Sequence, residues 1–128
     1  MELRHWTALL RLMSLMVLAD ARIREEEIRV FVYRMKGLRD RLAKDLMFSE
    51  GLVRDWFDAH ADELKTALKD EPEATVDAAL ERLDDFPKAQ KLVDALNAVA
   101  RADGERHDSE MEIIRRAALR WETSVPRR

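Results

Sequence analysis

The chain has 128 residues, which is enough for one domain with its own hydrophobic core and too few for two. It contains no cysteine, which excludes disulfide frameworks, thiolate zinc sites and cysteine nucleophiles and suits a reducing cytosol. A formal charge of -3 is close to balanced, so no strong field draws the whole chain onto nucleic acid. We therefore expect a single cytoplasmic domain over residues 1–123, followed by a basic tail over residues 124–128.

Apolar residues recur at steps of three and four along nearly the whole chain, which predicts an all-α fold. Three glycines and three prolines are too few for many strands and tight turns. Pro72 and Pro87 each stand where a first helical turn begins, since a missing N–H costs little there. The pattern predicts about seven helices in a compact array, over residues 3–17, 28–35, 38–46, 53–68, 72–83, 87–99 and 111–121.

The first predicted helix is apolar on almost every side between Leu9 and Ala19. It is interrupted by Arg11 and is too short to span a bilayer, and no segment resembles a signal peptide. We therefore expect this helix to be buried at the centre of the array.

An internal repeat is the most informative feature of the sequence. In two places an apolar helix ends in Ala-Asp, crosses a short turn, and restarts with a glutamate seven residues beyond the aspartate. An apolar residue follows each glutamate directly. The matched residues are Asp20 with Asp103 and Glu27 with Glu110.

Local chemistry explains part of this repeat. Gly104 suits the left-handed residue that follows a helix end. Glu27 and Glu110 fall near the third position of the next helix, where a carboxylate can cap a free N–H and favours the positive helix end. The aspartates oppose the helix dipole, so each needs either hydrogen bonds from turn N–H groups or a nearby cation. The sequence leaves both explanations open.

A helix, Ala-Asp-Gly, five residues, glutamate and a second helix, found in both halves of an all-helical chain, resembles the TerB tellurite-resistance family. The helical N-terminal domain of the DjlA co-chaperones is similar. The resemblance covers essentially the whole chain and implies two related halves whose acidic residues gather on one face to bind a metal ion. The residues carried over are Asp103, Glu105 and Glu110 in the second half and Asp20 and Glu27 in the first.

The first half departs from the family pattern at two positions. Ala21 replaces the glycine, and Arg22 replaces an acidic residue and would bring a positive charge beside any bound cation. Carboxylate ligands favour a hard ion such as calcium, magnesium or manganese. Neither segment supplies enough ligands alone, so the two turns would have to meet in space.

Other candidate residues point to no chemistry of their own. His5, His60 and His107 are too scattered for a zinc set, and we expect His60 to edge the core. The sequence has no nucleophile with a base and no phosphate-binding loop, so we do not expect an enzyme. Two basic clusters could contact an acidic partner or phosphate: Arg39, Arg41 and Lys44, and Arg115, Arg116 and Arg120.

The leading hypothesis from the sequence is a TerB-like, non-enzymatic module whose acidic face binds a divalent cation or a basic partner in a stress response. The alternative is a protein-interaction scaffold in which the acidic turns are purely structural. A nucleic-acid contact through the arginine clusters is a weaker third hypothesis.

Overall fold

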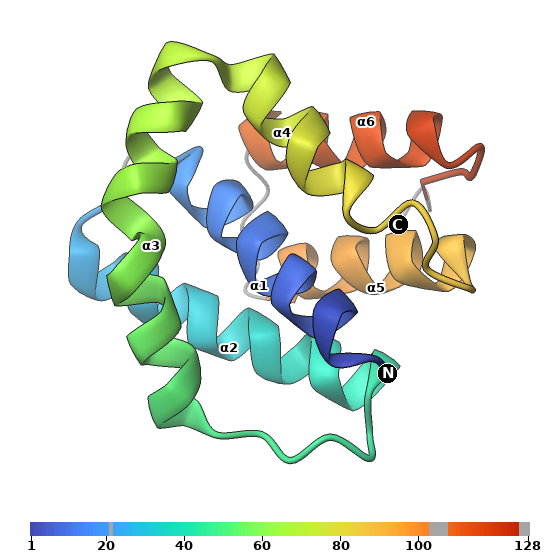
Figure 1. The fold of residues 1–128 in the computed structure, drawn as a ribbon, viewed down its shortest axis with the longest axis horizontal. Coiled ribbons are helices and arrows are strands. Elements are labelled where there is room, and N and C mark those ends of the chain that lie inside the picture. The colour runs from blue at the N-terminus through green and yellow to red at the C-terminus, as the bar shows by residue number, and fades with distance from the viewer. Residues whose placement is uncertain (21, 103–107, 126–128) are drawn as a thin grey trace.

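The computed structural model describes residues 1–20, 22–102 and 108–125, and these residues form six α-helices and no strand (Figure 1). The all-α prediction is therefore confirmed. The helices are α1 (Leu3–Leu18), α2 (Arg24–Leu42), α3 (Glu50–Asp70), α4 (Pro72–Glu81), α5 (Ala89–Arg101) and α6 (Asp108–Arg120).

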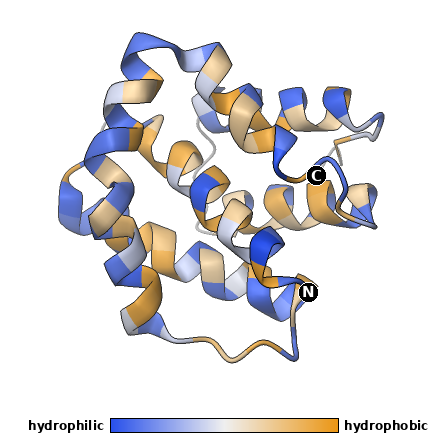
Figure 2. Ribbon diagram, in the orientation of Figure 1, coloured by the Kyte–Doolittle hydropathy of each residue, from blue (hydrophilic) through white to orange (hydrophobic). Residues whose placement is uncertain are grey.

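Helix α1 is the centre of the array, as its sequence predicts. It packs against α2, α3, α4 and α6, and every residue from Leu12 to Leu18 is buried. The other five helices each turn an apolar side inward, α5 through its contacts with α2 and α6, and Figure 2 shows hydrophobic and hydrophilic positions mixed along each of them. One continuous hydrophobic core results. None of the helices in the described ranges is long and apolar enough to cross a membrane.

The prediction of a separate short helix over residues 38–46 is wrong. Helix α2 continues through Gly37 to Leu42, and Leu46 lies in the connection to α3. Gly37 allows close packing here and does not end the helix: a Cβ at this position would lie 2.8 Å from Cγ1 of Val99 on α5. The glycine thus lets two helices approach each other.

Local signals fix the ends of the middle helices. The Ser49 side chain accepts a hydrogen bond from Leu52 N and caps α3. Pro72 is the first residue of α4, as expected, and it forces Glu71 out of the helical region, so α3 stops there. The expectation that Pro87 opens a helix is off by two residues. Lys88 has a non-helical backbone, and α5 begins at Ala89.

Candidate functional site

The first acidic turn lies against the start of the last helix. Helix α1 ends at Leu18, and Asp20 follows in the turn that leads to α2. The Ser109 hydroxyl, in the first turn of α6, donates to Asp20 Oδ1 over 3.4 Å. The first half of the repeat therefore contacts the beginning of the helix that carries Glu110. Asp103 and Glu105 lie outside the described residues.

Arg22 stands between acidic residues of the two halves. Its Nη2 lies 3.2 Å from Asp20 Oδ2 and 3.9 Å from Glu110 Oε1. Its side chain is only 5% exposed, so these charges interact away from bulk water. The residue that departs from the repeat in the sequence thus provides a positive charge at the point where the two halves meet.

Glu110 makes its closest contact with Arg34, a residue that sequence reasoning missed. Arg34 Nη1 and Nη2 donate to the two carboxylate oxygens over 2.7 and 3.2 Å, a two-pronged arrangement that joins α2 to α6. Both side chains are almost completely buried, at 0% and 1% exposure. The sequence held a signal, because Arg34 lies three residues after Phe31 and four before Leu38, within the apolar stripe of α2.

Glu27 occupies a separate position, between α2 and α3. It is buried, and its oxygens lie 3.7 Å from Arg24 Nε and 4.0 Å from Lys65 Nζ. Its N–H already bonds to Ile23 O, so it stands one position later in the helix than a capping glutamate would. Its cationic neighbours, Arg24 and Lys65, differ from Arg22 and Arg34, which pair with Asp20 and Glu110. The structure thus brings Asp20 and Glu110 together and leaves Glu27 apart.

These contacts show whether the described residues alone could coordinate a metal ion. Calcium or magnesium needs about six or more oxygen ligands at close range. The described ranges contain no group of three or more His, Asp or Glu side chains that could hold a metal. Asp20, Glu27 and Glu110 each have an arginine within 4.0 Å. The described residues alone do not fit a resident cation, and metal binding by the full set with Asp103 and Glu105 stays a prediction.

Comparison with known proteins identifies the family. The family model described as tellurite resistance protein TerB matches residues 6–120 of the 128-residue chain. The chain belongs to the TerB family. This confirms the resemblance drawn from the two acidic turns, and the match covers all six helices except the first three residues of α1. No match was found among curated proteins or among solved structures.

A groove of about 300 Å³ opens on the TerB domain beside the junction of the two halves. Its floor is apolar and its rim carries two exposed acidic residues, Glu73 and Glu112. Arg116 also lies on the rim, where both of its contacts to Asp77 on α4 measure 2.9 Å. Asp77 thus already neutralises this arginine. The full lining is Ala19, Leu68, Pro72, Glu73, Val76, Ser109, Glu112, Ile113 and Arg116.

The groove and the acidic junction share structural support. Ala19 and Ser109 line the groove, and the hydrogen bond from Ser109 to Asp20 joins the two segments that carry them. Helix α4 lies beside α6 (Figure 1), and the Arg116–Asp77 pair ties these helices together. The acidic turn therefore helps to fix the shape of one end of the groove.

The basic cluster on the last helix is also engaged within the chain. Arg120 donates to both carboxylate oxygens of Asp84 over 2.7 Å, and Trp121 Nε1 donates to the same residue over 2.9 Å. The hydrogen bond from Arg120 lowers the pKa of Asp84, with a smaller effect from Trp121. With Arg116 held by Asp77, two of the three arginines of this cluster join α6 to the segment around α4.

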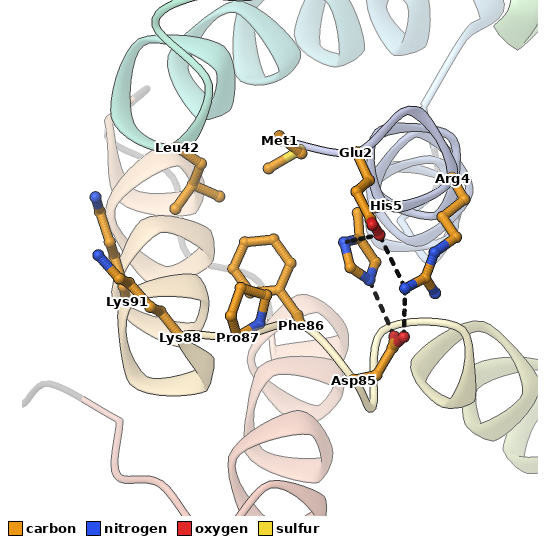
Figure 3. Close-up of a pocket in the computed structure, with 10 residues that line it drawn as sticks. All are labelled: Met1, Glu2, Arg4, His5, Leu42, Asp85, Phe86, Pro87, Lys88 and Lys91. Carbon is orange, nitrogen blue, oxygen red and sulfur yellow. Dashed lines mark hydrogen bonds and ion pairs between the residues drawn. The ribbon is translucent and has the colours of Figure 1, made fainter.

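A second, larger pocket of about 610 Å³ opens between the start of α1, the end of α2 and the loop before α5 (Figure 3). One wall contains His5, which is buried although the sequence pattern assigns it no role. Its Nε2 lies 3.0 Å from Asp85 Oδ1, its Nδ1 lies 3.6 Å from Glu2 Oε2, and its ring packs edge-on against Phe86. Arg4 binds the same two carboxylates. His5 lies on the buried face of α1, four residues before the buried Leu9. This helical spacing is the sequence signal that could have predicted its burial.

This network anchors the start of α1 to the loop before α5. The hydrogen bond from Arg4 is the main reason that the pKa of Asp85 lies well below its usual range, and His5 adds to the effect. Among the described residues, the pocket lining includes no serine, threonine or cysteine that His5 could activate as a nucleophile. We therefore assign the contact between His5 and Asp85 a structural role.

Proposed function

We propose that this TerB domain is a non-catalytic binding module that recognises a protein segment in the groove between α4 and α6. The segment carries an apolar side chain that enters the groove and basic residues that meet its rim. The family description concerns tellurite resistance, and we extend that stress-response setting, in the cytoplasm, to this chain as part of the proposal.

The observation that carries the proposal is the combination of an apolar floor with an acidic rim. Leu68, Val76 and Ile113 line the floor, and Glu73 and Glu112 lie at the edge. Among the described residues of the lining there is one arginine, Arg116, and Asp77 holds it. Arg115 lies 3.8 Å from Glu112 on the exposed side of α6, so these described side chains together leave the rim with a net negative charge, that of Glu73. A pocket of about 300 Å³ is at the small end of ligand sites, which favours a side chain of a partner over a large molecule.

Charge at the rim selects the partner. An acidic rim attracts a basic segment and disfavours an acidic one, and this selection weakens as salt screens the charges. An amphipathic helix with lysines beside its apolar face has the required chemistry. The same argument disfavours nucleic acid at this groove, because phosphates would meet Glu73 and Glu112.

Two model peptides test the proposal. Both are amphipathic helices with the same apolar residues, and the polar positions are lysine in one and glutamate in the other. We expect the lysine peptide to shift the NMR amide signals of Val76, Glu112 and Ile113 in the full chain, and the glutamate peptide to leave them unchanged.

A charge-reversal pair supplies the control. Glu73→Lys with Glu112→Lys should weaken binding of the lysine peptide at least about tenfold, since two favourable rim contacts become repulsive. Asp58→Lys, on an exposed position of α3 ten residues before Leu68, should bind like the wild type. Two results would contradict the proposal. One is equal binding of the lysine and glutamate peptides by the wild type; the other is an equal loss of lysine-peptide binding in the Glu73→Lys/Glu112→Lys variant and in Asp58→Lys.

A further inference from the structure

The junction of the two halves contains its own positive charges. Asp20 and Glu110 supply two carboxylates, and Arg22 and Arg34 supply two guanidinium groups. Arg22 contacts both acids, at 3.2 and 3.9 Å, and Arg34 holds both oxygens of Glu110.

All four side chains are largely shielded from solvent. Arg22, Arg34 and Glu110 are 5%, 0% and 1% exposed, and Asp20 is 13% exposed. Carboxylates that are brought together in such surroundings repel each other strongly, so a counter-charge is required. A divalent ion could supply it, but the ion would then lie beside two buried guanidinium groups that repel it in turn.

We infer that Arg22 and Arg34 take the place of a metal ion at this junction and hold the two halves of the domain together without one. Arg22 is the decisive residue because its guanidinium lies within 4.0 Å of an acid from each half, Asp20 and Glu110. The inference follows from the misfit between the described acids and a resident cation, and it does not depend on peptide binding in the groove.

Removing the positive charge of Arg22 should make the stability of the domain sensitive to divalent cations. In Arg22→Gln the two acids lose their shared counter-charge, so the domain should melt several degrees lower than the wild type. A divalent cation can then enter, because one of the opposing guanidinium groups is gone. A ligand that binds only the folded state raises the melting temperature, so added ion should restore about half of the loss or more.

The experiment measures thermal unfolding of the full chain after treatment with EDTA, with manganese or calcium chloride added up to millimolar concentration at constant ionic strength. Arg22→Lys keeps the charge, and Arg29→Gln removes an arginine of α2 that is 74% exposed. We expect the wild type and both of these variants to be insensitive to the ions, and Arg22→Gln alone to respond.

Two results would overturn the inference. One is a wild-type melting temperature that rises with manganese or calcium and falls again with EDTA. The other is an Arg22→Gln variant as insensitive to the ions as the wild type. If Arg22→Gln does not fold, the NMR amide signals of Ser109 and Glu110 in the wild type decide: unchanged positions on ion addition support the inference, and shifts refute it.

Discussion

Replacing Arg34 with methionine should destabilise the domain more than any substitution of an exposed arginine. The change leaves the Glu110 carboxylate buried at 1% exposure without the guanidinium that binds both of its oxygens. Removing one partner of a buried ion pair typically costs about 3–5 kcal/mol. Because small domains are stable by only about 5–15 kcal/mol, this is a large part of the total free energy of unfolding.

The assay is urea unfolding followed by circular dichroism and tryptophan fluorescence, with a thermal melt beside it. At roughly 4 °C per kcal/mol for a domain of this size, the melting temperature should fall by about 12–20 °C. The exposed control Arg29→Met loses only a contact of 4.0 Å to Glu26 and should change stability by less than about 0.5 kcal/mol.

A double-mutant cycle separates the ion pair from the packing of the arginine side chain. Arg34→Met combined with Glu110→Leu replaces both charges with apolar groups, which is often neutral or stabilising. We expect the double variant to be more stable than the sum of the two single changes by about 2–3 kcal/mol. Two results would refute this reasoning. One is a free energy of unfolding that Arg34→Met lowers no more than Arg29→Met does; the other is simple addition, in the double variant, of the changes caused by Arg34→Met and Glu110→Leu.

Three further substitutions test other parts of the structure. Gly37→Ala should lower stability by about 1 kcal/mol in urea unfolding, because overpacking against Val99 outweighs the better helix propensity of alanine; a stabilised variant would refute the close approach. Ser49→Ala should cost about 1 kcal/mol by removing the cap of α3, and Ser49→Asp should retain most of the stability. The folded-state pKa of Asp85 is lowered, chiefly by Arg4, so its contribution is present above the usual value of 3.8 and is lost as the pH falls below it. Asp85→Asn should therefore flatten the decline of stability in acid, and an unchanged acid profile would contradict this assignment.

Helix propensity and apolar spacing by themselves determine most of this fold. A stripe of apolar residues must be buried, so its period of three to four residues requires helices that pack around a common core. The near-continuous apolar run of α1 required the central position, and Pro72 marked the start of α4 because it lacks an N–H. The repeated Ala-Asp turn pointed to the TerB family, which the family match confirmed.

The sequence could not decide whether a glycine ends a helix or packs against another one. Gly37 has the same local signature in either case, and only the position of Val99 on α5 distinguishes them. For the same reason the pattern predicted about seven helices where the described residues form six.

The partners of the acidic residues were likewise decided by tertiary structure. Asp20 and Glu27 both stand in the sequence as carboxylates of the first turn, yet Asp20 contacts Ser109 and Arg22, and Glu27 faces Arg24 and Lys65. Glu110 meets Arg34 across 76 positions of the chain. The sequence shows that a residue carries a carboxylate. The charges of the side chains around it depend on which helices pack together, because electrostatic forces act through space and not along the chain.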